Sequence, residues 1–298
     1  MNSQKRVRQH KFVEKAPVAT ALVMSILWLV MFQLIGLPVN GAISLFIDGY
    51  SIEQGIAGLA VSILTCLALY KLWFRPEFEG MLKGNLALGF LLGLIELGYV
   101  LISFVPGLLA GEALEIKPLS AAIIATSLTA GFGEELVFRG VLVSTLMRQW
   151  KDKGKFMAAA IISGVFFGLI HGTNIFAGAD PGQTVLQMIG SVGIGIFFSA
   201  VYLRSGSVLP CMFYHTVHDI IAIAGESNVS DEGIITGSNI NWTDWVNLVL
   251  TIILTAIGLW LLRAAKNGEM REIWNRKWKI ETGIPGDVNP VDPKAGES

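Results

Sequence analysis

The residues best suited to chemistry are two adjacent carboxylates, Glu134 and Glu135, and the guanidinium of Arg139. They lie inside an apolar segment, residues 119–147, that is long enough to cross a bilayer as a helix. A charge at that depth is costly unless it is paired or faces water, so it indicates a functional site. On a helix Glu135 and Arg139 share a face and can form an ion pair. Glu134 is rotated by about 100° and stays available to water or substrate. The alternative is that all three only stabilise helix packing.

Two later apolar segments carry further groups suited to acid–base chemistry. His171 ends one of them, and His215 and Asp219 lie four residues apart on one helical face of the other. Taken alone, each group also fits a structural role, as an interfacial histidine or a polar clasp between helices. At a rise of about 1.5 Å per residue, Glu134, His171 and His215 are expected at a similar depth. They can therefore converge if their helices are neighbours.

The composition places these segments in a membrane. The chain is 53% hydrophobic and 15% charged, whereas soluble domains contain about 25% charged residues. Apolar segments that approach or exceed the length of a membrane-spanning helix cover residues 17–38, 54–72, 85–110, 119–147, 156–172, 184–203, 207–225 and 244–262. The sequence therefore predicts an all-α polytopic membrane helix bundle with about eight transmembrane helices. Nothing in it supports binding to nucleic acid.

The basic residues indicate the orientation of the chain. If the N-terminus is cytoplasmic, all of the 22 lysines and arginines except Lys117 and Arg139 fall in inner segments. This asymmetry predicts a multi-pass protein of the plasma membrane with both termini in the cytoplasm.

Three regions follow from this map. They are a basic cytoplasmic segment at 1–16, an eight-helix transmembrane domain at 17–262 with its motif-bearing core at 119–225, and a C-terminal region at 263–298. The last region combines a basic amphipathic segment with a Pro- and Gly-rich tail that is predicted to be disordered. In the amphipathic segment, tryptophans alternate with basic residues. That pattern fits a helix on an anionic membrane surface and equally a solvated helix that follows the last span.

The three polar constellations, in order on successive spans, resemble the motifs of the CPBP family. This family contains the CAAX proteases and bacteriocin-processing enzymes and is also called the Abi family. The motifs read Glu134-Glu135-x-x-x-Arg139, Phe167-x-x-x-His171 and His215-x-x-x-Asp219. The resemblance covers residues 119–225 and implies eight transmembrane helices and intramembrane endopeptidase activity.

The resemblance also implies roles for individual residues. Glu134 becomes the principal catalytic carboxylate, and Glu135 with Arg139 completes the first motif. His171 is the histidine of the second motif, and His215 begins the third. The family's third motif commonly ends in asparagine, whereas this chain has Asp219. Asp219 must be protonated to donate to an oxyanion, or else it orients a neighbouring histidine.

The expected reaction is attack on a peptide carbonyl by a water that Glu134 activates as general base with help from His171. His215, together with Asp219, would stabilise the oxyanion. Glu134, His171 and His215 are also candidate zinc ligands. A metal-free mechanism is favoured, because Glu134 cannot easily be both ligand and base. The expected partners are a membrane-associated peptide or protein substrate and the lipid bilayer, and the sequence leaves the oligomeric state open.

Two other functions stay open at this point. A non-catalytic membrane scaffold or bacteriocin-immunity protein would keep the fold without needing Glu134. A proton-coupled carrier would use the same buried acids and histidines as a relay, although no internal repeat is visible. Glu96, which lies in the segment 85–110, belongs to none of the motifs, and we expect a structural role for it.

Overall fold

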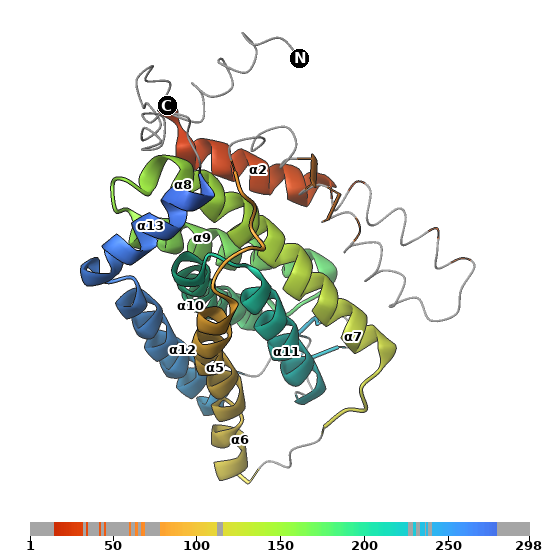
Figure 1. Ribbon diagram of the computed structural model, residues 1–298. Helices are drawn as coiled ribbons and strands as arrows, with labels where there is room; N and C mark the ends of the chain where they lie inside the picture. Colours follow the sequence, from red (N-terminus) through yellow and green to blue (C-terminus); the bar gives the residue numbers. More distant parts are fainter. Residues whose placement is uncertain are drawn as a thin grey trace, which may run out of the picture.

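The computed structural model describes residues 15–31, 78–111, 116–225 and 240–278, together with isolated positions at 34–68 and 229–237 (Figure 1). These ranges form helices, apart from two isolated bridges that join Phe78 to Trp278 and Val229 to Ile235. The predicted all-α membrane bundle is therefore confirmed. The N-terminal segment 1–14 and the tail 279–298 lie outside the described residues.

Among the described residues, five helical units are long and apolar enough to cross a membrane: Leu86–Leu109, Ala121–Trp150, Phe156–Ala177, Pro181–Ser205 and Trp242–Leu261. Two further apolar helices are shorter: α2 at Pro17–Met31 and α11 at Leu209–Gly225. The predicted span at 54–72 falls almost wholly outside the described residues. A total of eight spans therefore stays a prediction.

Several of these helical units consist of two or more consecutive shorter helices. The first unit contains α5 (Leu86–Ile102) and α6 (Val105–Leu109), and the second contains α7 (Ala121–Leu128), η3 (Thr129–Glu134), η4 (Leu136–Val143) and α8 (Ser144–Trp150). The third contains α9 (Phe156–His171) and the short 3₁₀ helix η5 (Gly172–Ala177). The remaining elements are α10 (Pro181–Ser205), α12 (Trp242–Leu261), η6 (Ala264–Lys266) and α13 (Asn267–Lys277).

Local sequence explains where the long helix α10 begins and ends. The side chain of Asp180 accepts a hydrogen bond from the backbone N–H of Gln183, and Pro181 occupies the first turn. Both features favour a helix start. The helix ends at Gly206, whose φ of 76° is the left-handed conformation that glycine adopts without strain. Arg204 in the last turn thereby comes to lie next to the start of α5, because the N–H of Asn85 donates to the carbonyl of Ser205.

The motif-bearing unit contains two π-helical stretches, η3 and η4, on either side of Glu135. A π-turn contains an additional residue compared with an α-turn and is frequent at functional sites. The periodicity of the sequence predicts an ordinary α-helix here, because a π-turn leaves no separate hydrophobic pattern. The side chains from Val137 to Val143 are buried, so this wider part of the helix forms the centre of the bundle.

Helices α9 and α10 approach each other closely through glycine. A methyl group on Gly164 would lie 2.7 Å from the carbonyl oxygen of Val192, and one on Gly195 would lie 2.8 Å from the Cα of Gly164. Small residues permit such contacts between membrane helices. The contact holds the carbonyl of Gly195, on α10, next to the residues that α9 contributes to the site.

The C-terminal helix α13 lies across one end of the bundle, near α8 (Figure 1). Trp274 and Trp278 are almost completely buried, and their indole N–H groups donate to the carbonyls of Leu203 and Ser144. The tryptophans that suggested a membrane-facing or solvated helix thus pack against the protein itself. This packing fixes α13 over the end of α10.

Helix α11 packs against α7 and against η3, which continues α7 in the same helical unit (Figure 1). A Cβ on Gly131 would lie 2.1 Å from the hydroxyl oxygen of Thr216 and 2.7 Å from its backbone nitrogen. We expect Gly131→Ala to destabilise the protein by about 1–3 kcal/mol, because a backbone atom cannot move aside as a side chain can. The measurement is thermal unfolding in detergent. Gly190→Ala on α10 is the matched control, since nothing lies within 4 Å of that added methyl, and equal loss in both variants would contradict the prediction.

Candidate active site

The centre of the site is a buried ion pair between Glu135 and Arg139. Arg139 Nη1 lies 2.7 Å from Glu135 Oε1, and both side chains are fully buried. Arg139 Nη2 also donates to the carbonyl of Gly195, at 3.2 Å. The ion pair predicted from the four-residue spacing is confirmed. Because its second donor group binds α10, Arg139 also connects the motif-bearing helix to the rest of the bundle.

Aromatic rings surround the guanidinium of Arg139. Its Cζ lies 4.5 Å from the centre of the Phe167 ring and 5.6 Å from that of Phe198. A desolvated cation over an aromatic face gains electrostatic energy. The rings therefore replace part of the hydration that Arg139 loses on burial.

His215 joins α11 to this ion pair. Its Nδ1 lies 2.9 Å from Glu135 Oε1, so one carboxylate oxygen contacts both the guanidinium and the imidazole. The imidazole stacks on Phe198, with ring centres 5.8 Å apart, and meets the edge of Phe167 at 5.6 Å. An ionised carboxylate only accepts hydrogen bonds. Nδ1 therefore donates to Glu135, and this contact directs Nε2 to the opposite side of the ring.

Glu134 and Asp219 lie on that opposite side. Glu134 Oε2 is 3.9 Å from His215 Nε2, and Asp219 Oδ2 is 3.6 Å from the same atom. Both separations exceed direct hydrogen-bond length and are of the size that a bridging water accommodates. Glu134 Oε2 has no hydrogen-bond partner among the described protein groups. About a fifth of each carboxylate side chain is exposed, 23% for Glu134 and 21% for Asp219.

His171 approaches the group from the end of α9. Its Nδ1 lies 2.8 Å from the carbonyl of Phe167. A carbonyl only accepts, so Nδ1 carries the proton and Nε2 carries the lone pair of the neutral ring. The Phe167 ring lies edge-on to His171, with ring centres 4.9 Å apart. Phe167 thus contacts His171, His215 and Arg139, and it connects the three motifs.

A second carboxylate–histidine pair lies beside the site. His218 Nδ1 is 2.5 Å from Oε1 of the fully buried Glu96 on α5. Tyr99 stacks on the His218 ring and shares a hydrogen bond with Thr251 on α12. This pair links α5, α11 and α12, as expected of a structural role for Glu96.

The candidate zinc ligands do not fit a metal in this arrangement. Within the described ranges, no group of three or more His, Cys, Asp or Glu side chains is placed so that it could hold a metal ion. We therefore describe the chemistry of this site through the chain's own side chains.

All six predicted site residues belong to one connected group, although they come from three helices. The motif pattern already included Phe167, but only as a spacer before His171. Phe198 and the Gly195 carbonyl gave no sequence signal, because each contributes through a contact that only the packing of α10 creates.

Comparison with known proteins identifies the region around this site. Residues 116–221, which include all three motifs, match the family model of the Rce1-like type II CAAX prenyl endopeptidases. No curated protein and no solved structure matches the chain. This match covers the motif-bearing region and confirms the CPBP resemblance of the three motifs.

Proposed function

We propose that the protein is an intramembrane endopeptidase that hydrolyses a peptide bond of a membrane-associated substrate, using a water activated by Glu134 and His171. The observation that carries this proposal is the difference between two adjacent carboxylates. Glu135 accepts from Arg139 and His215. Glu134, by contrast, lies 3.9 Å from His215 Nε2, beyond direct hydrogen-bond length, and its side chain is 23% exposed.

In the proposed reaction, a water between Glu134 and the substrate attacks the peptide carbonyl carbon. Glu134 takes the proton of that water, and the Nε2 lone pair of His171 accepts a hydrogen bond from it and orients it. The carbonyl oxygen becomes an oxyanion, and His215 donates Nε2–H to it. The carbon–nitrogen bond then breaks, and Glu134 returns its proton to the leaving amine. The products are one carboxylic acid and one amine.

Asp219 fits a positioning role for His215 in this scheme. Asp219 Oδ2 lies 3.6 Å from His215 Nε2, and Glu134 Oε2 lies 3.9 Å from the same nitrogen. With Glu135 on Nδ1, these acids balance the charge of an imidazolium that donates from both nitrogens. The aspartate that replaces the usual asparagine thus supplies charge rather than an amide donor.

We further propose that the basic end of the bundle faces the cytoplasm, with both termini on that side and the plasma membrane as location. Lys83 precedes α5, Arg204 lies in the last turn of α10, and Arg263 follows α12. These helix ends meet at one end of the bundle, as the positive-inside rule requires. The domain limits 17–262 and 263–298 follow from the same placement.

The test is cleavage by purified protein in detergent. Two peptides are offered, one with a prenylated CAAX C-terminus and one with the same sequence but a plain acyl anchor, and products are identified by mass spectrometry. Cleavage of either peptide supports an endopeptidase, and preference for the prenylated one assigns the substrate class. A folded preparation that leaves both intact contradicts the proposal for these substrates and favours the scaffold or immunity function.

A further inference from the structure

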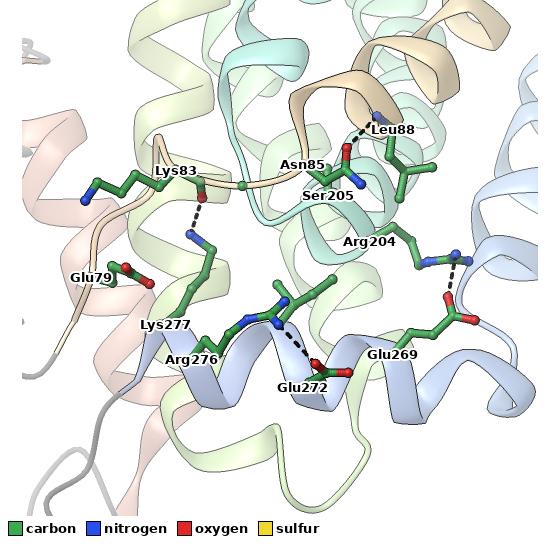
Figure 2. A pocket seen from close by; sticks show the side chains of 12 residues that line it. Glu79, Lys83, Asn85, Leu88, Arg204, Ser205, Glu269, Glu272, Arg276 and Lys277 are labelled. Atoms are coloured by element: carbon green, nitrogen blue, oxygen red, sulfur yellow. Dashed lines mark hydrogen bonds and ion pairs between the residues drawn. The ribbon is translucent and has the colours of Figure 1, made fainter.

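A cavity of about 360 Å³ lies at the basic end of the bundle, between the start of α5, the end of α10 and the helix α13 (Figure 2). Its size is within the range of small-ligand sites in proteins. Its lining consists of Glu79, Lys83, Gly84, Asn85, Leu88, Arg204, Ser205, Glu269, Glu272, Ile273, Arg276 and Lys277. None of the three motifs contributes to it, so its role is separate from the candidate active site.

Most of the charges around the cavity are already paired. Arg204 binds Glu269 and Arg276 binds Glu272, each at 3.0 Å (Figure 2). The remaining charged groups are the ammonium groups of Lys83 and Lys277 and the carboxylate of Glu79. With four cations against three carboxylates, the lining carries one excess positive charge.

Lys277 is a buried cation, and its Nζ lies 5.7 Å from the centre of the Phe78 ring and 6.0 Å from that of Trp274. The residue is only 3% exposed, and its Nζ donates to the carbonyls of Gly80 and Lys83, each at 2.7 Å. No carboxylate among the described residues forms an ion pair with it. Burial lowers the pKa of Lys277 to about 8, and the nearby Glu79 opposes this shift. A buried ammonium without a counter-ion favours an anion beside it.

The first turn of α5 adds a second positive feature. The N-terminus of this helix faces the cavity, because Asn85 and Leu88 both line it. The N–H of Leu88 is already bonded to the Asn85 side chain, and the N–H of Leu86 to the carbonyl of Gly84. The helix dipole therefore remains as the feature that attracts an anion. Lys277 and the start of α5 are distant in the sequence and converge on one cavity.

We propose that this cavity binds the phosphate group of an anionic phospholipid, with Lys277 as its main contact and the dipole of α5 beside it. A phosphodiester carries one negative charge, which matches the single excess charge of the lining. Apolar surface for acyl chains continues along α5, where Leu86, Leu91 and Leu94 are about half exposed. Basic pockets between helices on the cytoplasmic side are suited to such headgroups. The site is independent of proteolysis.

The experiment uses the purified full-length protein in detergent and follows its thermal unfolding as ligand is added. The ligands are phosphatidylglycerol, phosphatidylcholine and inorganic phosphate. We expect phosphatidylglycerol to raise the unfolding temperature in a saturable way, with little effect of phosphatidylcholine. An equal rise with inorganic phosphate would support the phosphate site and assign it to the free ion. No rise with either phosphatidylglycerol or phosphate would overturn the proposal.

Lys277→Gln tests the central contact, since glutamine keeps two N–H donors for the neighbouring carbonyls but removes the charge. We expect the apparent affinity for phosphatidylglycerol to fall at least tenfold, which corresponds to about 1.4 kcal/mol of binding free energy. Arg271→Gln is the matched control, because Arg271 is exposed on the same helix and lies outside the lining. Equal affinity of the Lys277→Gln variant and the unaltered protein would contradict the assignment.

The pH dependence of phosphatidylglycerol binding can be measured on the unaltered protein, so this test does not require a variant that folds. The groups that face Lys277 are Glu79, Lys83, Arg204, Glu269, Glu272 and Arg276. Carboxylates and guanidinium groups keep their charge between pH 7 and 9.5. Because the free protein loses the Lys277 proton above about pH 8, apparent affinity should fall across this interval. An affinity that is unchanged from pH 7 to 9.5 would contradict a charged Lys277 contact.

Discussion

Replacing Glu134 by glutamine is expected to lower peptide cleavage by roughly 10²–10⁴-fold, which is the usual contribution of a general base. The amide cannot take a proton from water, yet it matches the carboxylate in shape. Glu134 Oε2 makes no hydrogen bond to the described protein groups, so the fold loses no partner. The thermal unfolding midpoint should therefore stay close to that of the unaltered protein.

The measurement compares new peptide termini in membranes of cells that carry either form at matched expression. Products that disappear with Glu134→Gln identify substrates and cut sites. Glu272→Gln changes an exposed carboxylate on α13 to an amide and is the control for that chemical change. Identical profiles for the Glu134→Gln variant and the unaltered protein would point to a scaffold or immunity protein. A change confined to pH-dependent uptake would point to a carrier.

Removing the guanidinium of Arg139 is expected to have the largest effect on stability. Arg139→Met leaves Glu135 buried without its main counter-ion and removes one of the donors to the Gly195 carbonyl, which Ser199 Oγ still contacts. Breaking a buried ion pair in this way costs about 3–5 kcal/mol. The free energy of unfolding in detergent, measured with denaturant, tests the prediction. Cleavage should fall as well, because Glu135 also holds His215.

A double-mutant cycle measures the interaction energy between Glu135 and Arg139 separately from their contacts with other residues. Glu135→Gln combined with Arg139→Met leaves no unpaired buried charge, so its cost should be smaller than the sum of the two single changes. Arg276 and Glu272 provide the exposed counterpart, with the same four-residue spacing and a 3.0 Å contact. Arg276→Met should cost under about 1 kcal/mol, since water screens exposed pairs. Similar losses at Arg276 and Arg139 would contradict the buried-pair interpretation.

The sequence was sufficient for the helical class, for the order of the motifs and for the pairing of Glu135 with Arg139. These features depend on local spacing and on the cost of charge in hydrocarbon. The π-helical widening around Glu135 could not be predicted, because its hydrogen-bond register leaves no periodic signal.

Contacts between segments distant in the chain could not be predicted from a single sequence either. His218 lies on the same helix as His215 and Asp219, but its hydrogen bond goes to Glu96, more than a hundred residues away. The buried tryptophans of α13 show the same limit. An amphipathic pattern reveals that a face is covered, whereas whether lipid or protein covers it depends on the position of the other helices.

Glu134 and Glu135 have different surroundings although they are consecutive in the chain. The Glu134 side chain is 23% exposed, while that of Glu135 is fully buried beside Arg139 and His215. A small molecule outside the bundle can therefore contact one carboxylate and not the other. Two consecutive residues thus divide two tasks: the first can meet a molecule that enters from outside, and the second maintains a dry contact that, through Arg139, joins three helices.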